Sequence, residues 1–420
     1  MALTRQQVAK LKSKLQRAVI DCSERCLYHS ALWAAELLNS LPDDESDPTA
    51  NEAGDIGLTT SQRDQSELML EMRETPKYLM AKTFFDCHEF ERCADTLLPG
   101  KNIADASIGF RQKKAVSLEH KDVSQRSLFL ATYALLILGE KEKTEAAGDI
   151  LGPSDTAMVV NQQIPRIKSI LQAWLDQKTR GSKTTSSEGW LEYLYGMALT
   201  KEGSYDLAKT WLVKSVAINP WNWGAWLELG GLINDAKELE TICSQLQPTV
   251  AAYIFAIFCR RELHQESKTL VSDIEQLQTV FPSSAFLQEQ KALVFFNMKE
   301  VYAAQTIFSD MLVSNPTYLE FLDHYSDVLF TLKSSDTLAF VAQIATRVEP
   351  YRPETCCIVG YYYASLSRKE MAIQYFRLAL LLDRHCTPAW RFLGHQYLKL
   401  QNWHAAISAY MRAISLDKRD

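Results

Sequence analysis

Three prolines recur at a fixed interval in the second half of the chain, and this period constrains the fold more than any other feature. Pro282, Pro316 and Pro350 follow one another at steps of 34 residues. Other positions keep the same step: small residues lie at Ala292, Ser326, Gly360 and Gly394. A second series, Phe308, Ala342, Phe376 and Tyr410, is aromatic in three of its four members. A period of this length indicates an array of one repeated supersecondary unit.

The order of residue types within one period is typical of the tetratricopeptide repeat (TPR). Small residues let the two helices of a hairpin approach closely, and an aromatic residue fills the space between hairpins. The proline then ends the second helix, because it lacks an amide hydrogen and clashes with the preceding turn. We therefore predict an all-α fold, in which helical hairpins stack into a right-handed TPR superhelix with a concave groove.

Composition agrees with this prediction and excludes one class of function. The 420 residues include 16 glycines and 13 prolines. Both residue types are rarer than usual, since glycine commonly makes up ~7% and proline ~5% of a chain, and this is expected for a chain that is mostly helix. The 45 basic and 51 acidic residues give a net charge of −6. A chain without a basic excess does not neutralise a phosphate backbone, so we predict no nucleic-acid partner.

The regularity of the pattern divides the chain into segments. Residues 42–67 are acidic and nearly free of large apolar side chains, which is typical of a flexible segment. We predict N-terminal helices at 1–41, an acidic flexible insert at 42–67, irregular TPR-like hairpins at 68–175, a polar linker at 176–188 and the TPR array at 189–420. Within the array, repeats are predicted to start near residues 189, 223, 251, 285, 319, 353 and 387. The repeat at 223 is short, and we expect its second helix to be short.

Neither a membrane segment nor a disulfide framework is expected. The longest uncharged stretch, 241–259, contains Pro248 and several polar residues, so it is a poor membrane span. The N-terminus carries basic residues where a signal peptide would be apolar. Nine cysteines without a CxxC motif are typical of reduced thiols. We therefore expect a soluble intracellular protein.

Catalytic and metal-binding motifs are absent from the sequence. Cys22, Cys26 and His29 have the spacing of one helix face and could hold a metal ion, but packing of the small thiols is the favoured interpretation. Trp221, Trp223 and Trp226 could form a partner-binding patch, and here too packing is favoured. We predict no catalytic residue, no metal site and no cofactor.

Five strings of residues resemble a known family, in the same order along the chain. They are HSALWAAELLNSLP (29–42), YLMAKTFFDCHEFERCADTLL (78–98), WNWGAWLEL (221–229), YRPETCCIVGYYYASLSRKEMAIQYFRLAL (351–380) and AWRFLGHQYLKLQNWHAAISAYMRAISLDKRD (389–420). They are similar to subunit eight, or cell-division-cycle twenty-three, of the anaphase-promoting complex. Family members continue with further repeats, so the chain resembles an N-terminal portion.

The resemblance implies a non-catalytic scaffold subunit of a multisubunit ubiquitin ligase that controls mitotic progression. It implies the other subunits and the coactivators as partners, a nuclear and cytoplasmic location, and homodimers. Two alternatives remain open. A co-chaperone would clamp a carboxylate in the groove, but the groove positions Asp323, Asp327, Cys357 and Tyr361 do not suit one. The array could also be the substrate arm of a larger enzyme.

Two apolar surfaces suggest how a homodimer would form. The first is a stripe on the N-terminal helix, and the second comprises groove positions of the repeat at 189. The residues are Val8, Leu11, Leu15 and Val19 on the helix, and Trp190, Tyr193 and Met197 in the groove. An apolar helix and an apolar groove suggest helix-in-groove binding. The residues allow the groove to be filled by the same chain or by a second copy, and the resemblance favours the second copy.

Overall fold

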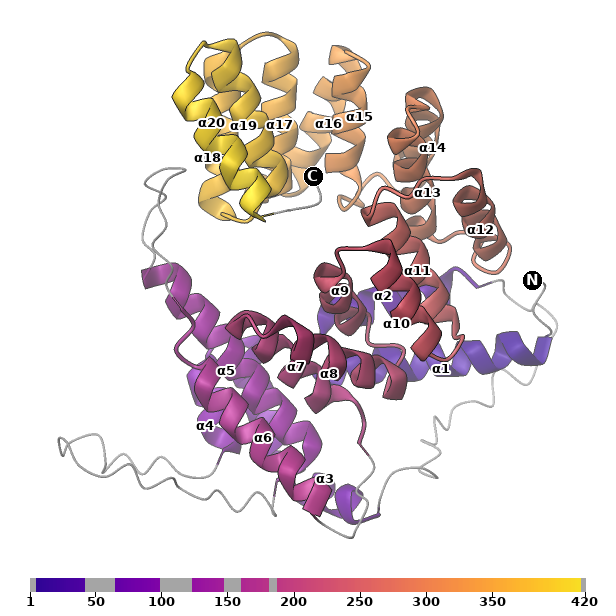
Figure 1. Cartoon of the computed structure of the whole chain (residues 1–420), viewed down its shortest axis with the longest axis vertical. Helices are drawn as coiled ribbons and strands as arrows, with labels where there is room; N and C mark the ends of the chain where they lie inside the picture. The colour runs from indigo at the N-terminus through magenta and orange to yellow at the C-terminus, as the bar shows by residue number, and fades with distance from the viewer. Residues whose placement is uncertain (1–4, 42–64, 99–122, 147–159, 181–186, 417–420) are drawn as a thin grey trace.

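The chain folds into helices that pair as hairpins and stack along a curved array. The computed structural model describes residues 5–41, 65–98, 123–146, 160–180 and 187–416 (Figure 1). Over these residues there are 20 helices and no strand. The predicted all-α TPR fold is confirmed. None of the described helices is long and apolar enough to cross a bilayer.

The first six helices build the N-terminal part. They are α1 (Arg5–Glu24), α2 (Tyr28–Asn39), α3 (Gln65–Asp86), α4 (Phe90–Leu97), α5 (Gln125–Ala146) and α6 (Ile164–Arg180). Most of the acidic insert predicted at 42–67 lies outside the described residues, and α3 begins at Gln65. Helix α6 continues into the segment predicted as a linker, of which residues 181–186 are not described.

Seven hairpins form the array, each an odd-numbered first helix and an even-numbered second helix. Their helices are α7 (Trp190–Glu202), α8 (Tyr205–Ile218), α9 (Trp223–Leu232), α10 (Ala236–Gln245), α11 (Val250–Glu262), α12 (Lys268–Gln278), α13 (Ala285–Asn297), α14 (Val301–Ser314), α15 (Leu322–Thr331), α16 (Ser335–Val348), α17 (Pro353–Ser365), α18 (Lys369–Leu382), α19 (Thr387–Lys399) and α20 (Trp403–Leu416). The first helices start beside the predicted repeat starts. Helix α10 has only 10 residues, as expected for the short repeat.

The small residues of the repeat lie where two helices of a hairpin touch. A Cβ atom added at Gly360 would lie 2.6 Å from the ring of Phe376, and one added at Gly394 would lie 2.9 Å from the ring of Tyr410. Both distances are below 3.0 Å, which is closer than a Cβ atom approaches another heavy atom in proteins. The first helices end in a repeated turn as well, because Lys299, Lys333, Ser367 and Gln401 all have positive φ, the conformation that closes a helix C-terminus.

The hydrophobic core follows the array rather than forming one globular centre. One buried cluster extends from Leu11 to Val294 and a second from Ala292 to Ala413. The N-terminal helices belong to the first cluster, and α2 packs on α9. Figure 1 shows α2 beside α9, although the two helices are far apart in sequence. The N-terminal hairpin therefore lies against the early repeats of its own chain.

Candidate interaction groove

Part of the concave surface is covered by the α1–α2 hairpin. The indole of Trp33 on α2 stacks on that of Trp223 on α9, and both side chains are buried. Phe258 and Phe286, from the next two first helices, meet the Trp223 ring edge to face. This aromatic cluster joins the hairpin to three repeats. Packing of the tryptophans is confirmed, since Trp226 is also buried.

A short polar contact fixes the same hairpin at one point. The Gly224 amide donates to Ser30 Oγ at 3.0 Å, and Ser30 Oγ donates to Asn222 Oδ1 at 3.3 Å. A Cβ atom at Gly224 would lie 2.9 Å from the Tyr193 hydroxyl. Glycine avoids this contact, and the added Cβ would also lie 3.3 Å from Ser30 Oγ of α2, so Gly224 lets Ser30 reach its partners on the array.

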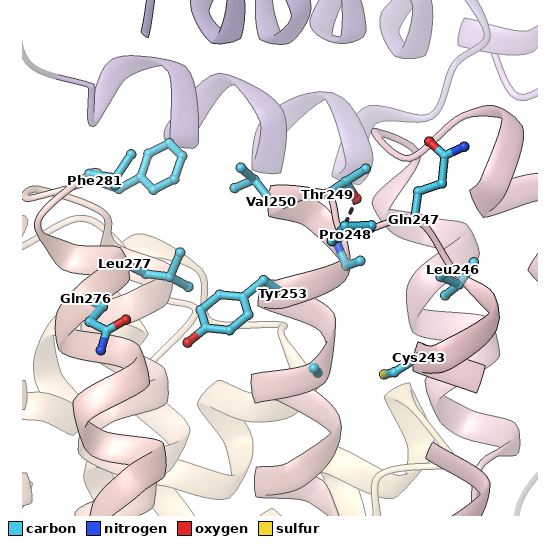
Figure 2. Close-up of a pocket in the computed structure, with 13 residues that line it drawn as sticks. Cys243, Leu246, Gln247, Pro248, Thr249, Val250, Tyr253, Gln276, Leu277 and Phe281 are labelled. Carbon is cyan, nitrogen blue, oxygen red and sulfur yellow. Dashed lines mark hydrogen bonds between the residues drawn. The ribbon is translucent and has the colours of Figure 1, made fainter. Parts of the chain in front are cut away.

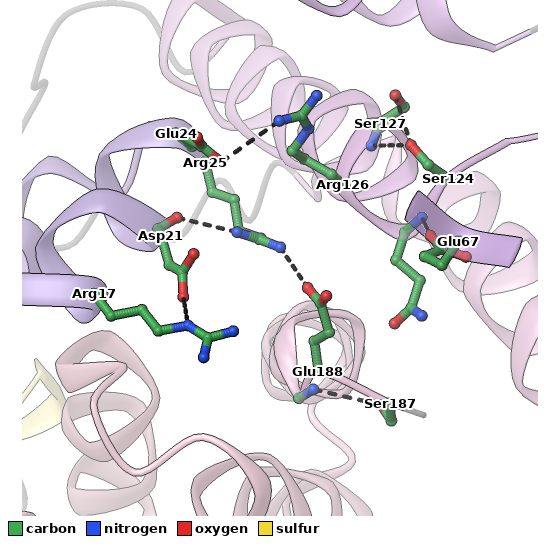
Figure 3. Close-up of polar contacts among 12 residues, drawn as sticks. Arg17, Asp21, Glu24, Arg25, Glu67, Ser124, Arg126, Ser127, Ser187 and Glu188 are labelled. Atoms are coloured by element: carbon green, nitrogen blue, oxygen red, sulfur yellow. Dashed lines mark hydrogen bonds and ion pairs between the residues drawn. The ribbon is translucent and has the colours of Figure 1, made fainter. Parts of the chain in front are cut away.

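Arg25, at the turn between α1 and α2, provides a charged contact. Its side chain is 1% exposed and pairs with the Glu188 carboxylate, with Nη2 and Oε2 2.5 Å apart (Figure 3). Its guanidinium also lies 4.7 Å from the centre of the Trp190 ring. A second ion pair joins α5 to α1, because Arg126 Nη1 of α5 lies 3.5 Å from Glu24 Oε2 of α1. A buried charge is costly unless it is paired, so Glu188 fixes the position of this turn.

The residues predicted for a dimer interface lie in this region and are covered within one chain. Leu11, Leu15, Trp190 and Tyr193 are buried, and Val8, Val19 and Met197 are partly buried. Burial raises the pKa of the Tyr193 hydroxyl, and the nearby Glu228 carboxyl adds to this shift. Both surfaces are thus covered in the single chain, and the pairing of the α1 stripe with the groove at Trp190 stays a prediction.

Beyond the hairpin the concave surface is open and polar. A pocket of about 270 Å³ lies between the first helices α13, α15, α17 and α19. Its lining includes Asp323, Asp327, Cys357 and Tyr361, so the predicted groove positions do face one pocket. Arg391 of α19 donates to Asp327 of α15 at 3.2 Å, across the intervening α17. This ion pair joins the first helices of the fifth and seventh hairpins across the open groove.

One carboxyl at the edge of the open groove has an unusual environment. Burial raises the pKa of Glu289 to about 7, while the nearby His324 opposes this shift. Glu289 Oε1 and His324 Nε2 are 3.8 Å apart. Glu289 on α13 and His324 on α15 thus lie side by side on adjacent first helices.

A second, apolar cavity lies on another face of the array. It has a volume of about 480 Å³ and opens between α10, α11 and α12 (Figure 2). Leu246, Val250, Tyr253, Leu277 and Phe281 contribute to its walls. Residues 246–249, between the end of α10 and the start of α11, form part of its lining.

Two interpretations of cysteines are resolved by the turn between α1 and α2. Helix α1 ends at Glu24, Cys26 has a positive φ of 59°, and α2 begins at Tyr28. The prediction that Cys22, Cys26 and His29 share one helix face is therefore wrong. Both thiols are buried and His29 is exposed, so packing of the thiols is confirmed. In the described part of the chain no cluster of three potential metal ligands occurs.

Sequence reasoning did not find Arg25, Glu188 or Ser30. Their partners are 163 and 192 residues away in sequence, and no repeat register links the pairs. The one available signal was Asn222 beside the tryptophans, since a polar residue in an apolar segment needs a partner.

Comparison with known proteins identifies the family. The profile described as anaphase-promoting complex subunit 8 / Cdc23 matches residues 10–292, and a tetratricopeptide profile matches 353–386 and 387–420. The chain belongs to the anaphase-promoting complex subunit 8 family. The matched region includes the N-terminal hairpin and the groove that it covers.

Several relatives of the subunit 8 family are similar over most of this chain. Subunit 8 of Arabidopsis thaliana is 30% identical over 93% of this chain and 66% of its own length. The CDC23 subunit of Saccharomyces cerevisiae is 28% identical over 94% of this chain and 70% of its own length. The human Cdc23 homologue is 29% identical over 76% of this chain and 46% of its own length. The chain thus spans from about half to about two thirds of these relatives.

A solved structure shows the same type of fold. The crystal structure of the anaphase-promoting complex hetero-tetramer Cut9–Hcn1 matches with a TM-score of 0.54 and 18% identity. The match covers 81% of this chain and 59% of the other. At this identity the likeness supports the TPR superhelix of the subunit 8 chain and nothing further.

Proposed function

We propose that this chain acts as a non-catalytic scaffold subunit of the anaphase-promoting complex, a multisubunit ubiquitin ligase that controls mitotic progression. Family membership carries the proposal. The open groove supports it, because the stacked first helices line it with polar and charged side chains suited to an extended partner segment. The Asp323 carboxylate in the pocket of this groove favours basic segments of the other subunits and of coactivators. The same assembly implies a nuclear and cytoplasmic location.

Affinity purification of the full-length protein, followed by mass spectrometry, tests the assembly. We expect the cullin-like and RING subunits of the ligase to co-purify, and their absence would contradict the proposal. A groove variant with Asp323→Lys and Asp327→Lys should lose partners that dock in the groove. Asp336→Lys, on the exposed face of α16, is the matched control and should retain them.

Homodimerisation is part of the proposal, by reciprocal exchange of the α1–α2 hairpin. An exchanged element keeps its contacts, so Trp33 would stack on Trp223 of a second copy and Arg25 would pair with its Glu188. The apolar stripe with Leu11 and Leu15 would then cross between chains. Exchange is compatible with the contacts described above, because it needs no new surface.

Light scattering at micromolar concentration tests the dimer. We expect a dimer for the intact chain and a monomer when Leu11 and Leu15 are both changed to Glu. Circular dichroism of that variant separates loss of dimerisation from loss of helix. Ile20→Glu, at an exposed position of the same helix, should leave the dimer intact. A monomeric intact chain would rule the exchange out.

The alternative of a co-chaperone receives no support from the groove. A clamp for a C-terminal carboxylate needs convergent cations, and Arg391 is already paired with Asp327. Peptides with acidic C-termini should therefore not bind. A substrate arm of a larger enzyme would need a catalytic domain elsewhere in the full-length protein, which sequencing of the complete reading frame would reveal.

A further inference from the structure

Two cysteines from neighbouring hairpins meet at the open groove. Cys357 lies on α17 and Cys386 directly precedes α19, and their sulfur atoms are 3.8 Å apart. Both line the pocket that contains Asp327 and Arg391. A disulfide bond is about 2.05 Å long, so roughly 1 Å of movement by each sulfur would join them.

The two thiols differ in a way that suits stepwise oxidation. Cys386 is the N-terminal capping residue of α19 and is partly exposed. The contact with the Cys357 thiol, and then the nearby Ala389 amide, lower the pKa of Cys386. Cys357 is buried, and its contact with Cys386 and its burial raise its pKa. A thiolate at a helix N-terminus is the form of cysteine that reacts with oxidants, so Cys386 is the residue to be oxidised first. The buried Cys357 thiol beside it can then react with the oxidised sulfur.

We propose that Cys357 and Cys386 form a reversible disulfide when the protein meets a peroxide. The Cys386 thiolate attacks one peroxide oxygen, the O–O bond breaks, and hydroxide leaves as water, which gives a sulfenic acid. The Cys357 sulfur then attacks the Cys386 sulfur and loses its proton, and the hydroxyl group leaves as water. Two thiols and one hydrogen peroxide thus yield one disulfide and two waters. Glutathione or another cellular thiol reverses the reaction by exchange.

The bond would link the last two hairpins at the floor of the groove. Its ends are 29 residues apart in sequence, and it would fix α17 against the start of α19. Arg391 of α19 and its partner Asp327 depend on that spacing. Oxidation would therefore hold the groove at one width and remove both thiols from its lining. The site does not depend on the proposed function, because it is defined by this chain alone.

Peptide mapping after hydrogen peroxide treatment of the intact protein tests the proposal. Trypsin releases Cys357 in peptide 348–368 and Cys386 in peptide 385–391. We expect a linked peptide that has lost two hydrogen atoms and that separates on reduction. Exposed Cys87 reports that the oxidant has reacted. Oxidation of Cys87 without the linked peptide would overturn the proposal.

Three variants assign the bond to its residues. Cys386→Ser and Cys357→Ala should each abolish the linked peptide. Serine is a favoured N-cap residue, so Cys386→Ser keeps the start of α19. The matched control is Cys356→Ser, whose sulfur lies 4.0 Å from the Pro350 carbonyl on another side of α17, and it should form the linked peptide as the parent does. A linked peptide that persists in Cys357→Ala would assign the bond to Cys356 and refute the pair.

Discussion

The indole rings of Trp33 and Trp223 lie parallel within 7°, with their centres 4.4 Å apart. One ring belongs to the second helix of the chain and the other to the second repeat of the array. Stacked aromatic rings contribute beyond the area they bury. This pair therefore couples the stability of the α1–α2 hairpin to that of the repeats on which it lies.

Trp33→Ala should detach the N-terminal hairpin. We expect a loss of about 3–5 kcal/mol in the free energy of unfolding, because a buried indole leaves a large cavity. Urea denaturation measures the loss, and hydrogen exchange should show reduced protection in α1 and α2. Leu32→Ala is the control, since Leu32 is 45% exposed on the same helix. Equal effects of the two substitutions would contradict the role of the stacked pair.

Arg25→Met should weaken the same hairpin through a buried charge. The substitution leaves Glu188 without its cation, and we expect destabilisation by roughly 3 kcal/mol. Arg25→Lys should recover only part of it, because ammonium lacks the planar fork of the guanidinium group. Arg17→Ala removes an exposed contact with Asp21 and should cost less than about 1 kcal/mol. Thermal unfolding of the four proteins compares these effects.

The array could be predicted from sequence because each repeat constrains the next. Gly360, Phe376 and Gly394 are placed by a fixed register, so helix pairs and groove positions follow from counting. The covered groove at Trp190 and Tyr193 was predicted as an apolar surface for the same reason. Repeat periodicity, however, says nothing about what lies on a surface.

The contacts of the α1–α2 hairpin could not be predicted in this way. Arg25 finds Glu188 across 163 residues, and such a pair leaves no periodic signal. The turn at Cys26 was also hidden, because its left-handed backbone involves no glycine or proline. The cysteine contact between α17 and α19 depends on the distance between neighbouring hairpins, which spacing alone does not give.

Gly360→Ala should destabilise the sixth hairpin. The added methyl group meets the buried ring of Phe376, and we expect overpacking to cost about 1–3 kcal/mol. Ala372→Leu and Gly394→Leu crowd the same type of contact and should cost at least as much. Gly231→Ala is the control, because nothing lies within 4 Å of its added Cβ, and it should raise stability by up to about 1 kcal/mol. Calorimetry would expose a wrong register if Gly360→Ala were neutral.

A capping hairpin after the last repeat should stabilise the array. Helix α20 leaves a row of large apolar side chains open to solvent: Trp403, Ile407, Met411 and Ile414. The last described hairpin thus has an exposed apolar face. A fused hairpin with a polar outer face would cover this row. We expect a higher thermal midpoint than that of the same fusion with Trp403→Lys and Ile407→Lys. No gain over the unfused chain would contradict this.

Glu289 should make stability fall as pH rises. Burial raises the pKa of Glu289 to about 7, above the ~4.3 expected in the unfolded chain. Between these values the folded state binds a proton that the unfolded state has released. Its contribution is therefore complete below about pH 4 and is lost as pH passes through about 7, by about 1.4 kcal/mol for each pKa unit of difference.

Glu289→Gln should remove this dependence. The amide stays neutral and keeps the shape of the protonated carboxyl, so we expect the variant to gain stability over the parent between pH 5 and pH 8. Urea denaturation at four pH values across that range measures the two slopes. Glu275→Gln is the control, because the Glu275 side chain is 55% exposed and pairs with Lys291 at the surface. Its slope should match that of the parent. If the slope of Glu289→Gln also matches that of the parent, the Glu289 carboxyl is already ionised in the folded protein at pH 5.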